Sequence, residues 1–254
     1  MRVNLIPMAG IGSRFVNEGY KDPKPLIDVS GQPMIIRAAK SLPECDRWIF
    51  VCRTEHLRDY PLRETLEKEF PGVVIIDIDY LTEGQASTCL LAKDYFDLDD
   101  SLVIGACDNG MIYEMDKLGD LIDDERIDSL IFSFRNNVTV ERNPKMYGWI
   151  NVDDDENVSG MSVKVPISDD PVNDHAVVGS FWFRRAGDFV EMVESMIDKD
   201  LRINNEFYVD KVFDEFVAAG KRVKVFEIDK YICWGTPNDL KTYQYWKEYF
   251  QLTK

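Results

Sequence analysis

The feature that most constrains the fold is the alternation of short apolar runs with amphipathic segments before residue 111. The expected strands cover residues 2–9, 47–53, 73–80 and 101–110. Between them, residues 32–42 and 56–70 have helical periodicity, and a loop enters a further helix within 81–96. This alternation predicts a mixed, mostly parallel sheet covered by helices on both faces, an α/β fold.

The second half has a different pattern. Strands are expected at 128–136, 175–185 and 222–229, and 147–165 is typical of a hairpin with a tight Asp/Asn turn. Helices are expected at 188–200, 206–221 and 237–250, the last beginning at Pro237 or Asn238. No linker interrupts the chain, so we expect one domain, 1–254, with halves 1–135 and 136–254.

Positive charge is concentrated near the N-terminus of an otherwise acidic chain. The formal net charge is −16, which disfavours nucleic acids and anionic membranes as partners. Yet Arg14, Lys21 and Lys24 lie within eleven positions, after Gly10 and Gly12. Glycines let backbone N–H groups approach phosphate, and the cations add charge-assisted bonds. The stretch indicates a phosphate-binding loop; the alternative is a turn with scattered surface cations.

The cysteines and histidines give little sign of a structural metal. The five cysteines form no CxxC pair, and His56 and His175 are the only histidines. Reduced, mostly buried thiols are expected, as in a cytoplasmic protein, with no signal peptide and no membrane-spanning run. The aromatic residues Trp149 and 181–183 are expected in the core.

Asp108 follows an apolar strand, where a ligand crevice of an α/β sheet would lie. Magnesium needs only one or two protein carboxylates when a substrate supplies phosphate oxygens. Asp108 is therefore a candidate Mg²⁺ ligand; the alternative is a turn aspartate before Asn-Gly.

Three further stretches give weaker signals. Gln85, in the segment EGQAS, could contact a base edge, although a capped helix start has the same appearance. Lys164 is a candidate anion ligand or a solvated hairpin lysine. Glu206 and Asp210 are expected one helical turn apart, on one face, as a candidate acidic pair or a solvated first turn.

Together and in this order, the segments resemble the nucleotidyltransferase family of sugar-1-phosphate nucleotidylyltransferases and phosphocholine-type cytidylyltransferases. The matching stretches are MAGIGSRF with PKPLIDVSGQPMI, EGQAS, ACDNG, SVKVP, VVGSFWF and CWGTPNDL. They span nearly the whole chain.

The resemblance implies a three-layer, Rossmann-like nucleotide-diphospho-sugar transferase fold. It also implies that an acceptor phosphate attacks the α-phosphorus of an NTP and expels pyrophosphate, with Mg²⁺ as cofactor. Residues 1–135 would bind the nucleotide and 136–254 the acceptor. Arg14 and Lys24 would be catalytic, and Lys164, Gly179 and Glu206 would contact the acceptor. The nucleotide-binding residues would be Met8, Ala9, Gly10, Gly12, Ser13, Gln85 and Cys107.

The chain departs from the family pattern at two places. Cys233 stands where many members have a second metal-binding aspartate, so Asp229 or Asp210 could replace it, or Asp108 could act alone. Val163 replaces the usual glutamate before the lysine. Both changes argue against an ordinary hexose 1-phosphate acceptor.

The leading interpretation is a Mg²⁺-dependent enzyme that uses CTP, UTP or dTTP to make an activated precursor of cell-surface or capsule polysaccharide. A CTP-specific cytidylyltransferase acting on phosphocholine or a phosphoamino acid is an alternative, as is a catalytically silent nucleotide-sugar-binding homologue. A glycosyltransferase would predict an Asp-x-Asp motif, which Cys107-Asp108-Asn109 does not match. The aromatic closing helix is compatible with a homodimer or with packing on its own sheet.

Overall fold

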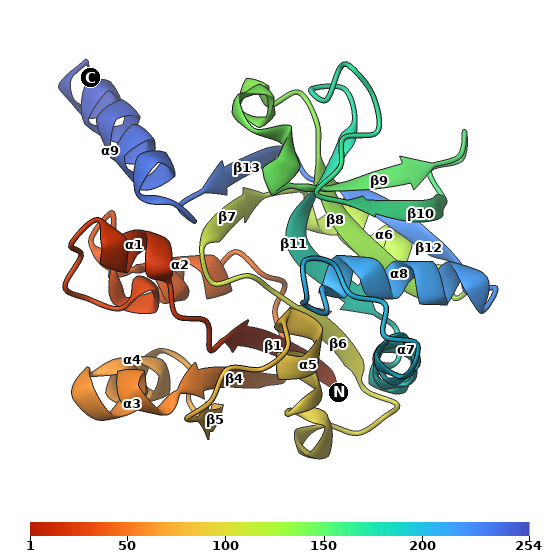
Figure 1. The fold of residues 1–254 in the computed structure, drawn as a ribbon, viewed down its shortest axis with the longest axis horizontal. Coiled ribbons are helices and arrows are strands. Elements are labelled where there is room, and N and C mark those ends of the chain that lie inside the picture. The colour runs from red at the N-terminus through yellow and green to blue at the C-terminus, as the bar shows by residue number, and fades with distance from the viewer. Residues whose placement is uncertain (254) are drawn as a thin grey trace.

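The computed structural model describes residues 1–253 and shows a mixed sheet between two helical layers (Figure 1). Its parallel part is ordered β6-β1-β4-β5 and comprises β1 (Arg2–Met8), β4 (Arg47–Arg53), β5 (Val74–Ile78) and β6 (Ser101–Ile104). In β1, Val3 and Leu5 pack into one apolar cluster and Ile6 and Met8 into another. The strand is therefore buried on both faces, as a parallel central strand requires.

Strand β11 (His175–Phe183) joins the two halves of the sheet. Along one edge it pairs antiparallel with β9 (Gly148–Val152) and then with β6, and along the other with β8 (Ser129–Phe134). β10 (Val158–Val163) completes the expected hairpin with β9, and β12 (Val223–Glu227) pairs parallel with β8. The register shifts between Val177 and Phe181, around Gly179 at φ +93°.

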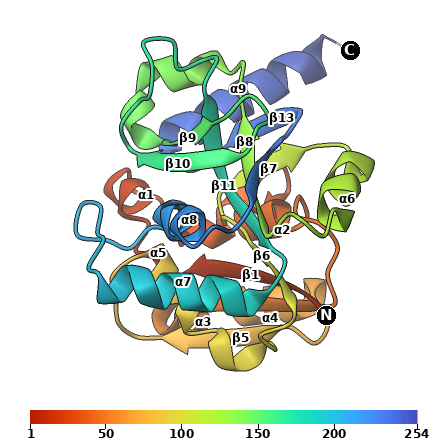
Figure 2. The ribbon, with the colours of Figure 1, turned by 90° about the vertical axis from the view of Figure 1, so that its right-hand side faces the viewer.

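Helices cover both faces of the sheet (Figure 2). One face packs against α5 (Gln85–Leu90), α7 (Ala186–Asp198) and α8 (Val209–Ala218). The other packs against α2 (Met34–Ala39), α4 (Leu62–Glu69) and α6 (Met115–Asp123). The short α3 (Thr54–Asp59) precedes α4. This arrangement confirms the expected three-layer mixed α/β fold.

A third apolar cluster holds the glycine-rich region against the C-terminal segment. It joins Phe15 of α1 (Ser13–Asn17) and residues around β2 (Asp28–Val29) and β3 (Gln32–Pro33) to Trp234 and Leu240. Trp234 follows β13 (Lys230–Cys233), which pairs with β7 (Asn109–Ile112). Because β7 begins directly after Asp108, this ribbon places the C-terminal segment beside that aspartate.

Helix α9 (Pro237–Leu252) begins at Pro237 as expected and projects from the body (Figure 1). Its aromatic side chains Tyr245, Trp246, Tyr249 and Phe250 are exposed, and Pro237 and Leu240 are its buried residues. Most of this helix therefore does not pack on the sheet, and a homodimer through it stays a prediction.

Most expected elements are present, and two expectations are wrong. The single helix expected at 56–70 is two helices, because Tyr60 before Pro61 is extended. Asp108 follows a strand as expected, in the connection from β6 to β7. Glu206 precedes α8 and forms a β-bridge with Ile203, so it does not share a helical face with Asp210. The core positions of Trp149 and residues 181–183 are confirmed, and all five cysteines are free thiols.

Candidate active site

The candidate site lies at the carboxyl ends of β1 and β6. From β1 the chain builds β4 and β5 on one side and then returns to form β6 on the other. A crevice opens at such a switch in strand order, and ligands of open α/β sheets bind there. The glycine-rich loop leaves β1 and the Asp108 loop leaves β6, so both flank this crevice.

The glycine-rich loop presents free backbone donors. Within the described residues, the N–H groups of Gly10, Ile11 and Gly12 donate no hydrogen bond to a protein acceptor. Gly12 has φ +67°, and a Cβ there would lie 3.2 Å from Lys24 Cβ. Glycine at position 12 therefore provides both the left-handed conformation and the close approach of Lys24 to the loop.

Lys24 and Asp108 form an ion pair across the crevice. Lys24 Nζ donates to Asp108 Oδ2, with side chains 21% and 26% exposed. Burial by itself would lower the pKa of Lys24, but the adjacent Asp108 carboxylate outweighs it and raises the pKa well above the usual value. Lys24 is therefore a fixed positive charge, and the Asp108 carboxylate is held beside it.

One cavity, of about 460 Å³, lies on the glycine-loop side of this ion pair. We call it the loop cavity. Lys24, Asp108 and Glu206 are its charged lining residues among those described. All seven residues expected to bind nucleotide line it: Met8, Ala9, Gly10, Gly12, Ser13, Gln85 and Cys107.

The Gln85 side of the loop cavity is fixed by a close backbone contact. Gly84 has φ +124°, and a Cβ on it would lie 2.6 Å from the backbone N and O of Phe207. Phe207 N donates to Glu83 O at 2.7 Å, and Ala86 N donates to Phe207 O at 2.9 Å. These two hydrogen bonds hold the Phe207 backbone against the Gly84 turn, so the preceding residue, Glu206, lines the loop cavity. Glu206 was expected to contact the acceptor.

A second cavity, of about 290 Å³, is also lined by Asp108. We call it the β11 cavity, because Val177, Val178 and Gly179 line it. It shares Ala106 and Asp108 with the loop cavity. The charged residues of its lining are Arg14, Asp108, Arg142, Asp210 and Asp239. Two ligands, one in each cavity, could thus both reach Asp108.

Two of the expected cations lie elsewhere. Lys21 lines neither cavity, and its carbonyl accepts from the Tyr60 hydroxyl at 3.1 Å. Lys164 follows β10 with φ +61°, and its Nζ lies 5.2 Å from the centre of the Tyr208 ring. Tyr208 lines the β11 cavity and Lys164 does not, so this lysine lies beside a ring of the cavity lining and is not itself part of that lining.

Asp210 lines the β11 cavity, and among the described residues no side chain donates a hydrogen bond to its carboxylate. Its carboxylate packs against Gly148, where there is no room for a Cβ. Burial raises the pKa of Asp210 to about 6, and the positive charge of Lys164 opposes this rise. Asp210 is therefore a carboxylate whose charged form is poorly stabilised by its surroundings.

Cys233 remains a thiol at the position where an aspartate was expected. Burial raises its pKa to about 12. Its Sγ accepts from Gly235 N at 3.3 Å and donates to Asp239 Oδ2 at 3.6 Å. Asp239 also accepts from the Thr236 hydroxyl at 2.6 Å. The thiol and hydroxyl thus orient a carboxylate in the β11 cavity that the sequence did not single out.

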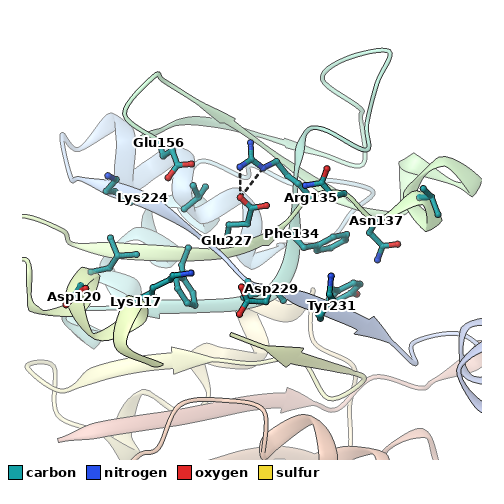
Figure 3. Close-up of a pocket in the computed structure, with 17 residues that line it drawn as sticks. Lys117, Asp120, Phe134, Arg135, Asn137, Glu156, Lys224, Glu227, Asp229 and Tyr231 are labelled. Carbon is teal, nitrogen blue, oxygen red and sulfur yellow. Dashed lines mark hydrogen bonds and ion pairs between the residues drawn. The ribbon is translucent and has the colours of Figure 1, made fainter. Parts of the chain in front are cut away.

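Asp229, the other expected metal ligand, lies in a third cavity of about 880 Å³ (Figure 3). The Arg135–Glu227 ion pair and the Lys117 and Asp120 side chains also line it. Asp229 lines neither cavity that contains Asp108. Within residues 1–253, no three His, Cys, Asp or Glu side chains are grouped as a metal site.

Three features of the site were missed from the sequence: Arg142, Asp239 and the tyrosines of the β11 cavity, Tyr147, Tyr208 and Tyr231. A charged residue in a polar loop or a first helical turn has no periodic pattern that separates it from a solvated one. Only the return of β13 beside β7 brings Tyr231 and Asp239 to Asp108.

Comparisons with known proteins establish the class of fold. No protein-family model and no curated protein matches the sequence. Solved structures do match. A nucleoside-diphosphate-sugar pyrophosphorylase from Vibrio cholerae RC9 is 20% identical with TM-score 0.75, covering 94% of this chain and 98% of its own. A putative glucose-1-phosphate thymidylyltransferase from Bacillus anthracis is 19% identical, with TM-score 0.73 and coverages of 96% and 94%.

An inositol-1-phosphate CTP transferase from T. maritima is 15% identical, with TM-score 0.72 and coverages of 96% and 94%. The chain therefore has the nucleotide-diphospho-sugar transferase fold, as the resemblance of its motifs implied. Among the described residues, no helix combines the length and apolar character needed to cross a membrane.

Proposed function

We propose that this protein is a Mg²⁺-dependent nucleotidyltransferase that joins an NTP to a phosphorylated acceptor and releases pyrophosphate. The observation that carries the proposal is the Lys24–Asp108 ion pair, placed where the loop cavity and the β11 cavity meet. The likeness of the fold to structures described as pyrophosphorylases and transferases supports the same reaction class.

In this proposal the NTP occupies the loop cavity. The free N–H groups of the loop bind its phosphates, and Gln85 contacts the base. Arg14 follows this loop on α1 and lines the β11 cavity, so the β- and γ-phosphates are proposed to extend toward it before they leave as pyrophosphate. Lys24 lines the loop cavity, paired with Asp108, which lines both cavities, and it offsets charge at the α-phosphorus. The acceptor occupies the β11 cavity, beside Gly179.

The electrostatic need for these cations is large. Two unit charges of like sign 4 Å apart repel by about 4 kcal/mol at a surface-like dielectric. An acceptor phosphate and a triphosphate each carry more than one charge, and Asp210 and Asp239 add to the repulsion. Without fixed positive charge, the two substrates would not share the crevice.

The residues present fit one magnesium ion. Asp108 lines both cavities and is the carboxylate that would hold the ion, with phosphate oxygens and water completing its shell. When bound, Mg²⁺ would neutralise phosphate charge and act as a Lewis acid. Lys24, already paired with Asp108, fixes the direction of that carboxylate.

For the acceptor and the nucleotide, we propose classes of compound and not a single compound. A phosphorylated sugar, giving an activated precursor for cell-surface polysaccharide, is the leading class, with CTP, UTP and dTTP as nucleotides. A CTP-specific reaction with a non-sugar phosphate is the second candidate, favoured by Val163 and Cys233 at positions where the family has carboxylates.

The test is pyrophosphate release from each NTP with a panel of phosphomonoesters, with and without Mg²⁺. The wild type is expected to turn over at least one pair only with Mg²⁺. Lys24→Met should lower kcat at least 100-fold, since fixed charge at a transition state contributes on this order. Lys21→Met is the matched control, because Lys21 lies nearby outside both cavities. No turnover with any pair, or equal rates for the two variants, would contradict the proposal.

A further inference from the structure

We propose that Arg142 binds the phosphate group of the acceptor, a role that the sequence indicated for Lys164. The inference rests on the proposed function and assigns a residue to its acceptor site. Arg142 ends the 3-10 segment Val138–Arg142, in the polar connection between β8 and β9.

Arg142 is part of the wall of the proposed acceptor site. It lines the β11 cavity together with Arg14, Asp108 and Gly179. The cavity's other cation, Arg14, lies on α1 directly after the glycine-rich loop, and the proposed function assigns it to the leaving pyrophosphate. Among the described lining residues, Arg142 is then the remaining positive side chain for a second phosphate.

Among the described residues, the Arg142 side chain has no hydrogen-bond or ion-pair partner. Among the arginine side chains of residues 1–253, only those of Arg14, Arg37 and Arg142 make neither a hydrogen bond nor an ion pair with protein atoms. Two of these three line the same cavity of an acidic protein. Elsewhere, exposed arginines such as Arg58 and Arg126 bind a nearby carboxylate. An unpaired guanidinium keeps its donors free for a bidentate phosphate contact.

Lys164, the expected ligand of the acceptor phosphate, does not line the β11 cavity. Its ammonium lies over the Tyr208 ring, outside the lining of the cavity, and its backbone has the left-handed φ of +61°. The cavity also contains Asp210 and Asp239, which repel a phosphate dianion. A cation inside the cavity is therefore required, and Arg142 is so placed.

The kinetic test compares Arg142→Gln, Arg142→Lys and the control Lys145→Gln, a change to an exposed lysine of the same connection outside the cavity. Arg142→Gln should raise the KM for the acceptor at least tenfold and change the KM for the NTP less than twofold. Arg142→Lys should recover part of the lost acceptor affinity, because lysine keeps the positive charge but lacks the planar guanidinium that donates two parallel hydrogen bonds to a phosphate. An acceptor KM equal to that of Lys145→Gln would overturn the assignment.

A binding test separates this inference from the proposed function. Calorimetric titration with inorganic phosphate should show about tenfold weaker binding by Arg142→Gln than by the wild type or Lys145→Gln. Equal binding by all three, or no binding by the wild type, would overturn the role of Arg142. Phosphate binding that depends on Arg142 in a wild type that releases no pyrophosphate would overturn the proposed reaction and keep Arg142 as a phosphate ligand.

Discussion

Asp210 shows how single residues of this site are held in unfavourable surroundings. Its carboxylate packs against Gly148 in the β11 cavity and gains no side-chain donor among the described residues. Burial raises its pKa to about 6. Such unfavourable placement is common where a ligand supplies the missing partner.

The pH dependence of stability follows from this shift. Between about pH 4 and pH 6 the folded protein holds a proton on Asp210 that the unfolded chain has released, so the free energy of unfolding falls as pH rises through that window. Asp210→Asn, which has nearly the same shape, removes the effect. Relative to the wild type, it should be about 1–3 kcal/mol more stable at pH 7 and nearly equal near pH 4.

Urea unfolding at the two pH values measures this difference. A variant that is less stable than the wild type at pH 7 would contradict the account of Asp210. A difference that does not change with pH would contradict it equally.

At the residue scale, the sequence indicated those site residues that lie in a recognisable local sequence pattern. Met8 to Ser13, Lys24, Gln85 and Asp108 lie in stretches that follow strands or start helices, and the structure brings them to one crevice. Arg142 and Asp239 could not be found in this way, because their relation to Asp108 depends on contacts between segments more than thirty residues apart.

At the scale of elements, the contact between the Gly84 turn and Phe207 sets the shape of the loop cavity. The turn precedes α5 and Phe207 precedes α8, and reciprocal backbone hydrogen bonds join them. This contact connects the two halves of the chain beside Gln85.

Gly84→Ala should disrupt this contact. The added Cβ meets the backbone of Phe207, and φ +124° is open almost only to glycine, so we expect a loss of about 2–4 kcal/mol in the free energy of unfolding. Gly72→Ala is the matched control: its φ is +79° with nothing within 4 Å of the added Cβ, and it should cost about 1 kcal/mol. Chemical denaturation compares the two, and equal losses would show that the Phe207 contact is unimportant.

Strands with long apolar runs could be predicted from the sequence. Short strands that form only by pairing with a distant segment could not. β1, β4, β8 and β11 match their expected ranges closely, since buried strands have near-continuous apolar sequences. β7 and β13 are short and pair only with each other, so neither has a pattern of its own. Helix α6 was not expected either, although Leu118 is buried in it.

At the scale of the whole molecule, the main feature is that an acidic chain gathers positive side chains at one site. A chain with a net charge of −16 places Lys24, Arg14 and Arg142 in the two cavities that share the carboxylate Asp108. The fold class followed from the alternation of strands and helices. The two cavities did not, because they depend on the register shift at Gly179 and on the return of β13 to β7.

The central claim is that an acceptor phosphate in the β11 cavity attacks an NTP in the loop cavity at its α-phosphorus. An acceptor labelled with ¹⁸O on its phosphate, followed by mass spectrometry of both products, tests this most directly. The account predicts that all label stays in the nucleotide-linked product, which contains the bridging oxygen, and that none enters pyrophosphate. Label in pyrophosphate, or release of orthophosphate in place of pyrophosphate, would contradict it.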